Sequence, residues 1–195
     1  MVRSPLLPRS LAGRSRLVYA LCVAAALLSA LVAVPQSAHA AGTCYPVSSH
    51  FAGEYYANPA NWGCATSPEY RYLNGSFQEF TKGEMVWSPS QGTNMVVSAR
   101  RYGTPQQGFL FHWGPSDPYN YDAWLTRVTY NGNLLFQKEC TAGVWGSGCG
   151  RTIGGLYVPY AGKGHYRIIT EGCDVSWTGS HTCRQGWTIP VDIFL

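Results

Sequence analysis

Short apolar runs separated by turn-forming residues fill the chain after residue 40, and this pattern limits it to an all-β fold. The runs are rich in β-branched and aromatic side chains, the separators are Gly, Pro, Asn and Ser, and helical periodicity is almost absent. We expect strands at residues 84–88, 95–100, 108–113, 123–130, 133–138, 156–159, 165–170 and 187–194. Asn131-Gly132 lies between two of these runs and tolerates the positive φ angles of a type I′ turn, so it predicts a tight hairpin.

The C-terminal half has the strand rhythm of an antiparallel β-sandwich. Phe109, Phe111 and Trp113 alternate along one run, and Trp124 and Val128 along the next, so each strand offers an apolar face to a core. In this rhythm and aromatic placement the region is similar to fibronectin type III or immunoglobulin-like modules. The resemblance implies a β-sandwich and assigns no functional residue.

The first forty residues have the three regions of an export signal. A basic stretch with four arginines precedes an apolar run at residues 17–34, Pro35 ends that run, and Ala38-His39-Ala40 supplies a small-x-small cleavage site. A retained membrane anchor is the alternative, because the apolar run reaches the roughly 18 residues that span a bilayer. The adjacent cleavage site favours removal at about Ala40, which predicts a secreted, soluble, extracellular or envelope-associated chain without a membrane segment.

Cleavage changes the charge of the chain. Four of the fourteen basic residues leave with residues 1–40 and none of the ten acidic ones does, so the remainder carries ten of each. Nucleic-acid binding needs clustered Lys and Arg to displace counterions, and a neutral chain does not provide them. Nucleic acid is therefore excluded as an expected partner.

Cysteine usage predicts three disulfides. Cys22 leaves with the signal, and the six that remain are Cys44, Cys64, Cys140, Cys149, Cys173 and Cys183. An even number in an exported chain indicates disulfides; fifteen pairings are possible, and the sequence-local couples favour 44–64, 140–149 and 173–183. The absence of close Cys-x-x-Cys spacing argues against zinc, and the lack of an odd cysteine argues against a thiol nucleophile.

Residues 102–107 break the strand pattern with Gly103, Pro105 and two glutamines. The break predicts an N-terminal module at residues 41–103 and a β-sandwich domain at residues 104–195. A continuous sandwich with a long loop at this place is the alternative.

Three segments of the N-terminal half carry a family resemblance: residues 66–69 (TSPE), 74–80 (NGSFQEF) and 83–92 (GEMVWSPSQG). Together they resemble one LGFP repeat at about residues 62–92, with Trp62-Gly63-Cys64-Ala65 in place of the name-giving tetrapeptide. The resemblance implies an extracellular module that engages the bacterial cell wall. The residues themselves predict a strand that ends in a Pro- and Gly-bearing turn, with Phe77, Phe80 and Trp87 in a core.

Ligand contacts are predicted in three loops. Residues 113–124 combine aromatic rings with carboxylates, a combination that suits a sugar because the ring offers a flat apolar face and the acid binds hydroxyls. The two cysteine-bracketed segments 140–149 and 173–183 each present one tryptophan. The predicted ligand-binding residues are Tyr119, Tyr121, Trp145, Trp177, Asp117 and Asp122. Burial of these rings in a core, and bridges that only stabilise hairpins, are the alternatives.

These features favour a non-enzymatic binder of cell-envelope or extracellular glycan. A protein-binding module such as a protease inhibitor or toxin-like effector is the second hypothesis, because rigid loops lose little entropy on association. A small glycan hydrolase is the third, with Glu69 and Glu84, or Asp117 and Asp122, as unconstrained carboxylate pairs. The histidines lack metal-ligand spacing, and no motif names a catalytic residue, so neither a metal nor a cofactor is expected.

Overall fold

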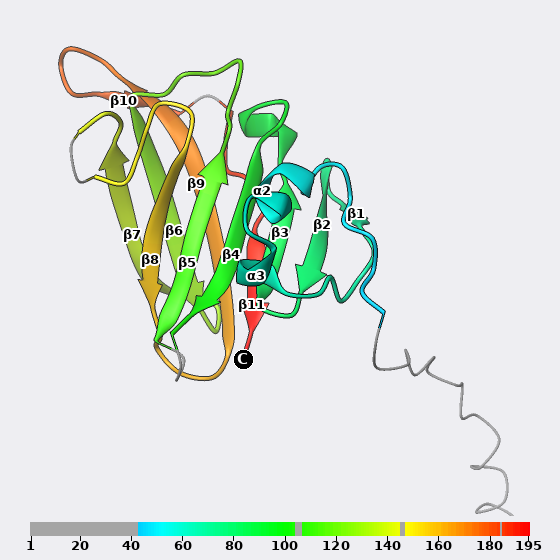
Figure 1. The fold of residues 1–195 in the computed structure, drawn as a ribbon. Coiled ribbons are helices and arrows are strands. Elements are labelled where there is room, and N and C mark those ends of the chain that lie inside the picture. The colour runs from blue at the N-terminus through cyan, green and yellow to red at the C-terminus, as the bar shows by residue number, and fades with distance from the viewer. Residues whose placement is uncertain (1–42, 104–106, 145–146, 184) are drawn as a thin grey trace, which may run out of the picture. The chain divides into compact units, whose positions relative to one another are not determined.

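The computed structural model describes residues 43–103, 107–144, 147–183 and 185–195 (Figure 1). The predicted export signal at residues 1–40 and the predicted ligand contact Trp145 lie outside these described residues. Within them, no helix is long and apolar enough to cross a membrane.

Six strands form the first antiparallel sheet, in the order β1-β2-β3-β4-β5-β8. Their bounds are β1 Tyr70–Tyr72, β2 Gly75–Phe80, β3 Gly83–Trp87, β4 Val96–Tyr102, β5 Gly108–Gly114 and β8 Gly154–Pro159. The short 3-10 helix η1 (Pro89–Gln91) connects β3 to β4. The predicted strands in this part of the chain are confirmed to within a few residues, whereas β1 and β2 were not predicted.

The second antiparallel sheet has the order β10-β9-β6-β7. Its strands are β6 Ala123–Tyr130, β7 Asn133–Thr141, β9 His165–Val175 and β10 His181–Thr182, and β11 (Val191–Phe194) pairs with β9 at residues 165–168. The hairpin predicted at Asn131-Gly132 joins β6 to β7, with φ angles of 50° and 81° at these two residues. The all-β, two-sheet architecture predicted from the sequence is thus confirmed.

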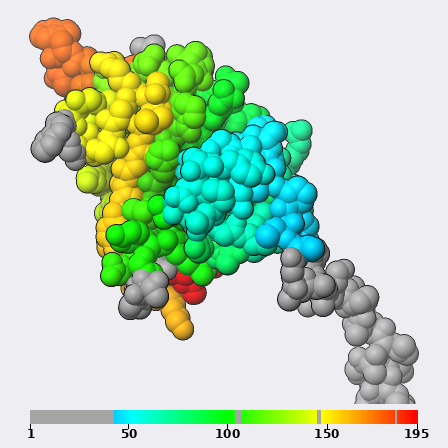
Figure 2. Space-filling view, in the orientation of Figure 1, coloured from blue at the N-terminus to red at the C-terminus, as the bar shows by residue number. Residues whose placement is uncertain are grey.

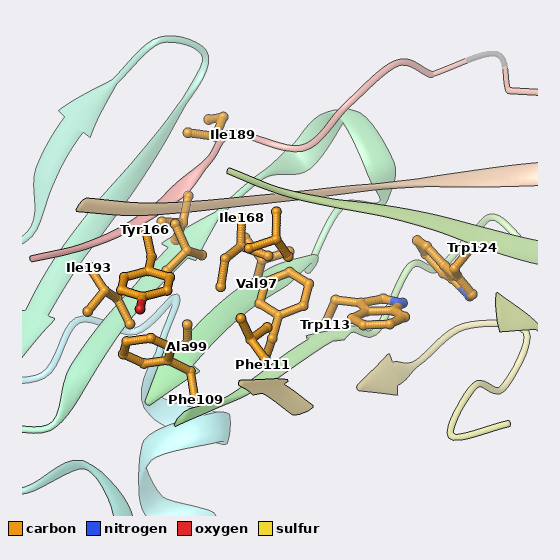
Figure 3. Close-up of a cluster of buried hydrophobic side chains, with 14 of the residues drawn as sticks. Val97, Ala99, Phe109, Phe111, Trp113, Trp124, Tyr166, Ile168, Ile189 and Ile193 are labelled. Carbon is orange, nitrogen blue, oxygen red and sulfur yellow. The ribbon is translucent and has the colours of Figure 1, made fainter. Parts of the chain in front are cut away.

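The main core lies between the two sheets (Figure 3). Phe109, Phe111 and Trp113 project from one face of β5, as their alternation predicts, and Trp124 and Tyr166 project toward them from the second sheet. The ring centroids of Trp113 and Trp124 are 5.7 Å apart. Aromatic pairs of this kind stabilise beyond the area that they bury.

A second core lies on the other face of the first sheet, where residues 44–65 cover β2, β3 and β4. This N-terminal segment contains α2 (Ala52–Ala57) and α3 (Pro59–Trp62), and in Figure 2 it forms the cyan surface beside the green one. Phe51 and Trp62 from the segment pack with Phe80, Met85 and Val96 of the sheet. The strands β2, β3 and β4 therefore have side chains buried on both faces of the sheet, one face in the main core and the other in the second core.

Three disulfides join Cys44 to Cys64, Cys140 to Cys149 and Cys173 to Cys183, which confirms the predicted pairing. The first joins the two ends of the N-terminal segment. The second joins the end of β7 to the β7–β8 connection, and the third joins β9 to the residue that follows β10. Each bridge restricts a short loop of the unfolded chain and stabilises the fold by about 2–3 kcal/mol in the chain-entropy model.

The chain from Cys44 to Leu195 forms one compact unit. The proposed module boundary between residues 103 and 104 falls in the connection from β4 to β5, and these strands pair over seven residues of the same sheet. The residues on either side of this boundary therefore belong to the same continuous sheet.

Candidate functional site

Glu69 is the centre of a hydrogen-bonded cluster at the edge of the N-terminal segment. Its carboxylate accepts hydrogen bonds from the Ser48 hydroxyl, at 2.5 Å, and from the Ser76 hydroxyl, and it contacts His50 Nδ1 at 2.7 Å. Burial raises the pKa of this carboxyl, but the hydrogen bonds from Ser48, Ser76 and His50 outweigh burial and hold the pKa below its ordinary value. An ionised Glu69 thus fixes the orientation of the His50 ring.

The His50 ring is also stacked on Trp87, with ring centroids 4.2 Å apart and an interplanar angle of 6°. Trp87 is itself held by a hydrogen bond from its Nε1 to the Thr93 carbonyl, at 2.9 Å. The His50 side chain remains 40% exposed. These contacts therefore pre-organise an accessible imidazole beside a half-buried indole.

A second polar cluster lies where α2 faces β4 and β5. Glu54 on α2 has one carboxylate oxygen 3.6 Å from His112 Nδ1, and its other oxygen is 3.5 Å from the Ser98 hydroxyl. Ser98 and His112 are directly paired across the two strands. Glu54 lies between the hydroxyl and the imidazole, so this arrangement differs from a hydrolytic triad, in which the histidine occupies the middle place.

These clusters line one groove between the N-terminal segment and the sheet. A cavity of about 530 Å³ lies between α2, α3 and the strands β4, β5 and β8, and Glu54 also lines a second cavity of about 420 Å³. His50 and Trp87 line the second cavity and a third one of about 210 Å³. Because neighbouring cavities share lining residues, we treat them as one feature, the sheet groove.

The far part of the sheet groove carries an exposed ring and several hydrogen-bonding side chains. Tyr157 on β8 is 45% exposed, and its hydroxyl donates to the Gln107 carbonyl at 2.6 Å, which fixes the ring. Arg100, Asn58 and Asn61 line the same cavity. The sheet groove is therefore lined by two well-separated aromatic rings, Trp87 and Tyr157, with donors and acceptors between them.

The glutamines of the LGFP-like segments have structural roles. Gln78 is fully buried and hydrogen-bonds the carbonyls of Pro46 and Ser67, so it holds the N-terminal segment on the sheet. Gln91 is also fully buried, accepts a hydrogen bond from the Gly172 N–H at 3.0 Å and donates to the Gly186 carbonyl. Gln78 thus supports the N-terminal wall of the sheet groove, whereas Gln91 ties η1 to β9 and to Gly186, and neither side chain lines the groove.

The predicted ligand residues belong to three loops that the fold brings to one end of the sandwich. The loops are the β5–β6, β7–β8 and β9–β10 connections, and backbone hydrogen bonds join them: Ser116 N–H to the Thr152 carbonyl, Tyr121 N–H to the Arg151 carbonyl, and Asp122 N–H to the Cys173 carbonyl. We call this end of the molecule the loop end. Five of the six predicted residues lie there, and the sixth, Trp145, lies outside the described residues.

Within the loop end the predicted residues have different environments. Tyr121 is only 3% exposed and packs edge-on against Trp124, so its ring belongs to the core. Asp122 pairs with Arg151 at 3.0 Å and accepts the Val175 N–H, so its carboxylate ties two loops together. Asp117 and Tyr119 are exposed.

Trp177 is 98% exposed at the tip of the β9–β10 hairpin. The tip is internally hydrogen-bonded, because the Ser176 N–H donates to the Ser180 carbonyl and the Ser176 hydroxyl lies 2.7 Å from that of Thr178. Together with the disulfide between Cys173 and Cys183, these contacts hold the backbone of the tip that carries Trp177.

The carboxylate pairs considered for hydrolysis do not share a cavity. Glu69 lines the sheet groove, whereas Glu84 projects toward β11 on the other face of β3. Asp117 is on an exposed loop, and Asp122 is engaged by Arg151. Among the described residues, no group of three or more His, Cys, Asp or Glu side chains is arranged to hold a metal ion.

The fold and the groove define a disulfide-bonded all-β protein with a polar, aromatic-flanked surface cleft. Residues 63–102 match the LGFP repeat family, a cell-wall-associated repeat, and the match runs from the end of the N-terminal segment through β4. A search of curated proteins gives no match. The matched region supplies Glu69, Trp87, Ser98 and Arg100 to the sheet groove, and it is consistent with a cell-envelope-related protein.

The sequence prediction missed the sheet groove. His112 and Arg100 alternate with buried residues on β5 and β4, so period-two alternation places both side chains on the face opposite the main core. This alternation could have identified the wall of the sheet groove that β4 and β5 form. The other wall is the N-terminal segment, whose two short helices have no readable periodicity.

Proposed function

We propose that this protein binds a cell-envelope polysaccharide in the sheet groove. The observation that carries the proposal is a row of three neighbouring cavities lined by the half-buried ring of Trp87, the exposed ring of Tyr157 and hydrogen-bonding side chains. Sugar rings pack their apolar faces on aromatic side chains, and their hydroxyl groups need donors as well as acceptors. Arg100, Asn58 and Asn61 supply donors, and Glu54 supplies acceptors.

Size and rigidity also support the proposal. Ligand sites for small molecules have volumes of roughly 300–1,000 Å³, so the cavity of about 530 Å³ suits one or two sugar residues. The neighbouring cavities extend the site along a chain. Because Trp87, His50 and Tyr157 are held by other contacts before any ligand arrives, little side-chain entropy is lost on binding.

Export and cleavage near Ala40 belong to the same proposal. The three disulfides support an oxidising compartment, and the LGFP match supports the cell envelope. The similarity of the C-terminal half to fibronectin type III or immunoglobulin-like modules stays a prediction and carries no part of the functional argument.

Binding to purified wall polysaccharide tests the proposal. We expect Tyr157→Ala to weaken binding by about tenfold, because an aromatic ring stacked on a flat ligand face contributes roughly 1–3 kcal/mol where alanine substitution has measured it, for nucleic-acid bases. Arg100→Ala should have an effect of similar size through the loss of charged hydrogen bonds. Co-sedimentation over a range of polysaccharide concentrations measures both changes.

Trp177→Ala is the matched control, because it removes an exposed ring from the loop end and leaves the sheet groove intact. Unchanged binding by this variant, with tenfold losses in the groove variants, is the expected pattern. Equal binding by Tyr157→Ala, Arg100→Ala and the parent protein would reject the groove as the polysaccharide site.

The loop end supports a second candidate function, the capture of an extracellular protein. The single observation in its favour is the almost complete exposure of Trp177 on a rigid, disulfide-tethered tip, since exposed tryptophans are frequent anchors of protein interfaces. Tyr119 and Asp117 lie on a neighbouring loop of the same end. Loss of polysaccharide binding in Trp177→Ala alone would transfer the glycan site to these loops.

A further inference from the structure

Arg100 on β4 points into the cavity of about 530 Å³ in the sheet groove and has no acidic partner there. Its side chain is half-buried, and its guanidinium group makes no hydrogen bond or ion pair with any described residue. A guanidinium group is always charged and carries five N–H donors in a planar fork. The cavity therefore offers a ligand a fixed positive charge with free donors.

The carboxyl group of the same cavity is engaged elsewhere. Glu54 is the one acidic side chain among the described residues that line this cavity. Its two carboxylate oxygens lie 3.6 Å from His112 Nδ1 and 3.5 Å from the Ser98 hydroxyl. Glu54 thus pairs with the β5 histidine, and the charge of Arg100 is left for the ligand.

The neighbouring residue Arg101 shows the contrast. Period-two alternation places Arg101 on the opposite face of β4, where it lines the separate cavity of about 180 Å³. The walls of that cavity include the carboxyl groups of Glu79, Glu84 and Asp192. Protein carboxyl groups therefore surround Arg101, whereas the cavity around Arg100 has the single carboxyl group that pairs with a histidine.

Arg71 repeats the arrangement in another cavity of the sheet groove. It lies on β1 directly opposite Ser76, which is opposite Trp87 in the next strand pair, so these side chains share one face of the sheet. Arg71 lines the cavity of about 210 Å³ together with Trp87 and Glu69. Glu69 already takes part in three side-chain hydrogen bonds, and Arg71 has no ion pair among the described residues.

Each of the two arginines lies in the same cavity as an aromatic ring. Arg100 is opposite Leu110, and Leu110 is opposite Tyr157, so the register puts Arg100 and Tyr157 on the same face. Arg71 and Trp87 line the other cavity. An aromatic ring that stacks on a sugar and an arginine that binds an anionic substituent of that sugar are thus available at two places.

We propose that the polysaccharide bound in the sheet groove is acidic, and that Arg100 and Arg71 bind its anionic groups. This inference rests on the proposed glycan-binding function and adds the chemical class of the ligand. Guanidinium groups bind carboxylates and phosphates through paired N–H donors, so the sugar carries either a carboxylate or a phosphodiester. Arg100 binds one such oxyanion beside Tyr157, and Arg71 binds another beside Trp87.

The overall charge of the chain does not provide this preference. Residues 41–195 carry ten basic and ten acidic side chains, so they have no net charge that attracts polyanions over a long range. The preference for an acidic glycan therefore depends on individual arginines, and single substitutions can remove it.

Co-sedimentation with purified wall polysaccharide in three forms tests the proposal. The first form is untreated. In the second, carbodiimide activation and borohydride reduction convert the carboxyl groups to alcohols, and in the third, cold hydrofluoric acid cleaves the phosphodiesters. We expect one treatment to weaken binding by about tenfold, because it removes charge-assisted hydrogen bonds. Loss after reduction assigns a carboxylate, and loss after hydrofluoric acid assigns a phosphodiester.

A pair of neighbouring arginines supplies the variant and its matched control. Arg100→Gln should bind the untreated polysaccharide about tenfold more weakly, and the effective treatment should cost this variant much less than it costs the parent, because both changes remove the same contact. Arg101→Gln makes the same change of charge on the opposite face, so it should behave like the parent protein.

Tyr157→Ala separates this inference from the proposed function. Stacking does not depend on the anionic group, so this variant should bind both the untreated and the treated polysaccharide more weakly than the parent does. Equal binding of all three forms by the parent, or equal losses in Arg100→Gln and Arg101→Gln, would overturn the acidic ligand and leave the groove as a glycan site. Failure of the parent protein to bind any form would reject the proposed function itself.

Discussion

Replacing Glu84 with glutamine should stabilise the protein at about pH 8 by a few kcal/mol and leave its stability nearly unchanged at about pH 4. The parent carboxyl group is 8% exposed and has its pKa raised by burial to about 8. Glutamine is neutral at every pH and keeps the hydrogen bond from the Asp192 N–H. The substitution therefore removes the ionisable group and preserves the contact.

The direction of this effect follows from proton binding. Below about pH 4.5, Glu84 is protonated in both the folded and the unfolded chain, and its burial has no ionisation cost. Between about pH 4.5 and pH 8 only the folded chain holds the proton, so the free energy of unfolding falls by about 1.4 kcal/mol per pH unit at most. Above the folded pKa both states are ionised, and the loss stays constant.

Urea unfolding at a series of pH values, with the disulfides intact, measures this difference between the parent and Glu84→Gln. Glu79→Gln is the comparison variant, because it keeps the buried Glu84 carboxyl group and removes one of the charges that raise its pKa, so the pH dependence should persist but be smaller. A stability difference between parent and Glu84→Gln that is the same at about pH 4 and pH 8 would contradict a raised pKa at this position.

Gly172→Ala should destabilise the protein by about 3 kcal/mol, which lowers Tm by roughly 10 °C. A methyl group at this position of β9 would lie 2.2–2.4 Å from three atoms of the Tyr121 ring. The ring cannot retreat easily, because it is buried against Trp124. Any shift of the backbone would also strain the hydrogen bond from Gly172 to Gln91.

Thermal unfolding of two further variants separates this clash from a general effect of alanine. Gly53→Ala adds a methyl group in α2 where no atom lies within 4 Å, so it should be neutral or slightly stabilising. In a Tyr121→Leu background the smaller side chain leaves room, so Gly172→Ala should cost less than about 1 kcal/mol. An undiminished cost in that background would show that Tyr121 is not the obstacle.

The same pair of residues shows why part of the fold was not predictable. Gly172 lies beyond the predicted strand at residues 165–170, whereas β9 continues to Val175. The glycine is needed there because the Tyr121 ring occupies the space of its missing side chain. Tyr121 was expected in an exposed loop. The residues near it in the sequence do not show that its ring packs against the glycine of a distant strand.

Local signals were sufficient elsewhere. Period-two alternation identified the core face of β5, and the bounds of β6 agree with the predicted run at 123–130. Each cysteine is disulfide-bonded to the nearby cysteine that was predicted as its partner. By contrast, the run at 187–194 becomes a strand only at Val191, because the Thr188 and Ile189 N–H groups bond to Thr170 and Ser88 instead.

The candidate site was less predictable than the fold because it is built from tertiary contacts. His50 and Glu69 are nineteen residues apart, and they meet because Gln78 holds the N-terminal segment on the sheet. Glu54 and His112 meet because the same segment covers β4 and β5. A groove formed between two layers leaves no pattern of this kind in the sequence.

NMR mapping of a soluble wall-glycan fragment tests the central claim most directly, because it locates the ligand without altering the protein. The groove account predicts that the largest amide shifts occur along β4, β5 and β8 and in residues 48–61, with little change at residues 176–180. Shifts concentrated at residues 116–122 and 176–180, with β4 and β5 unaffected, would contradict it.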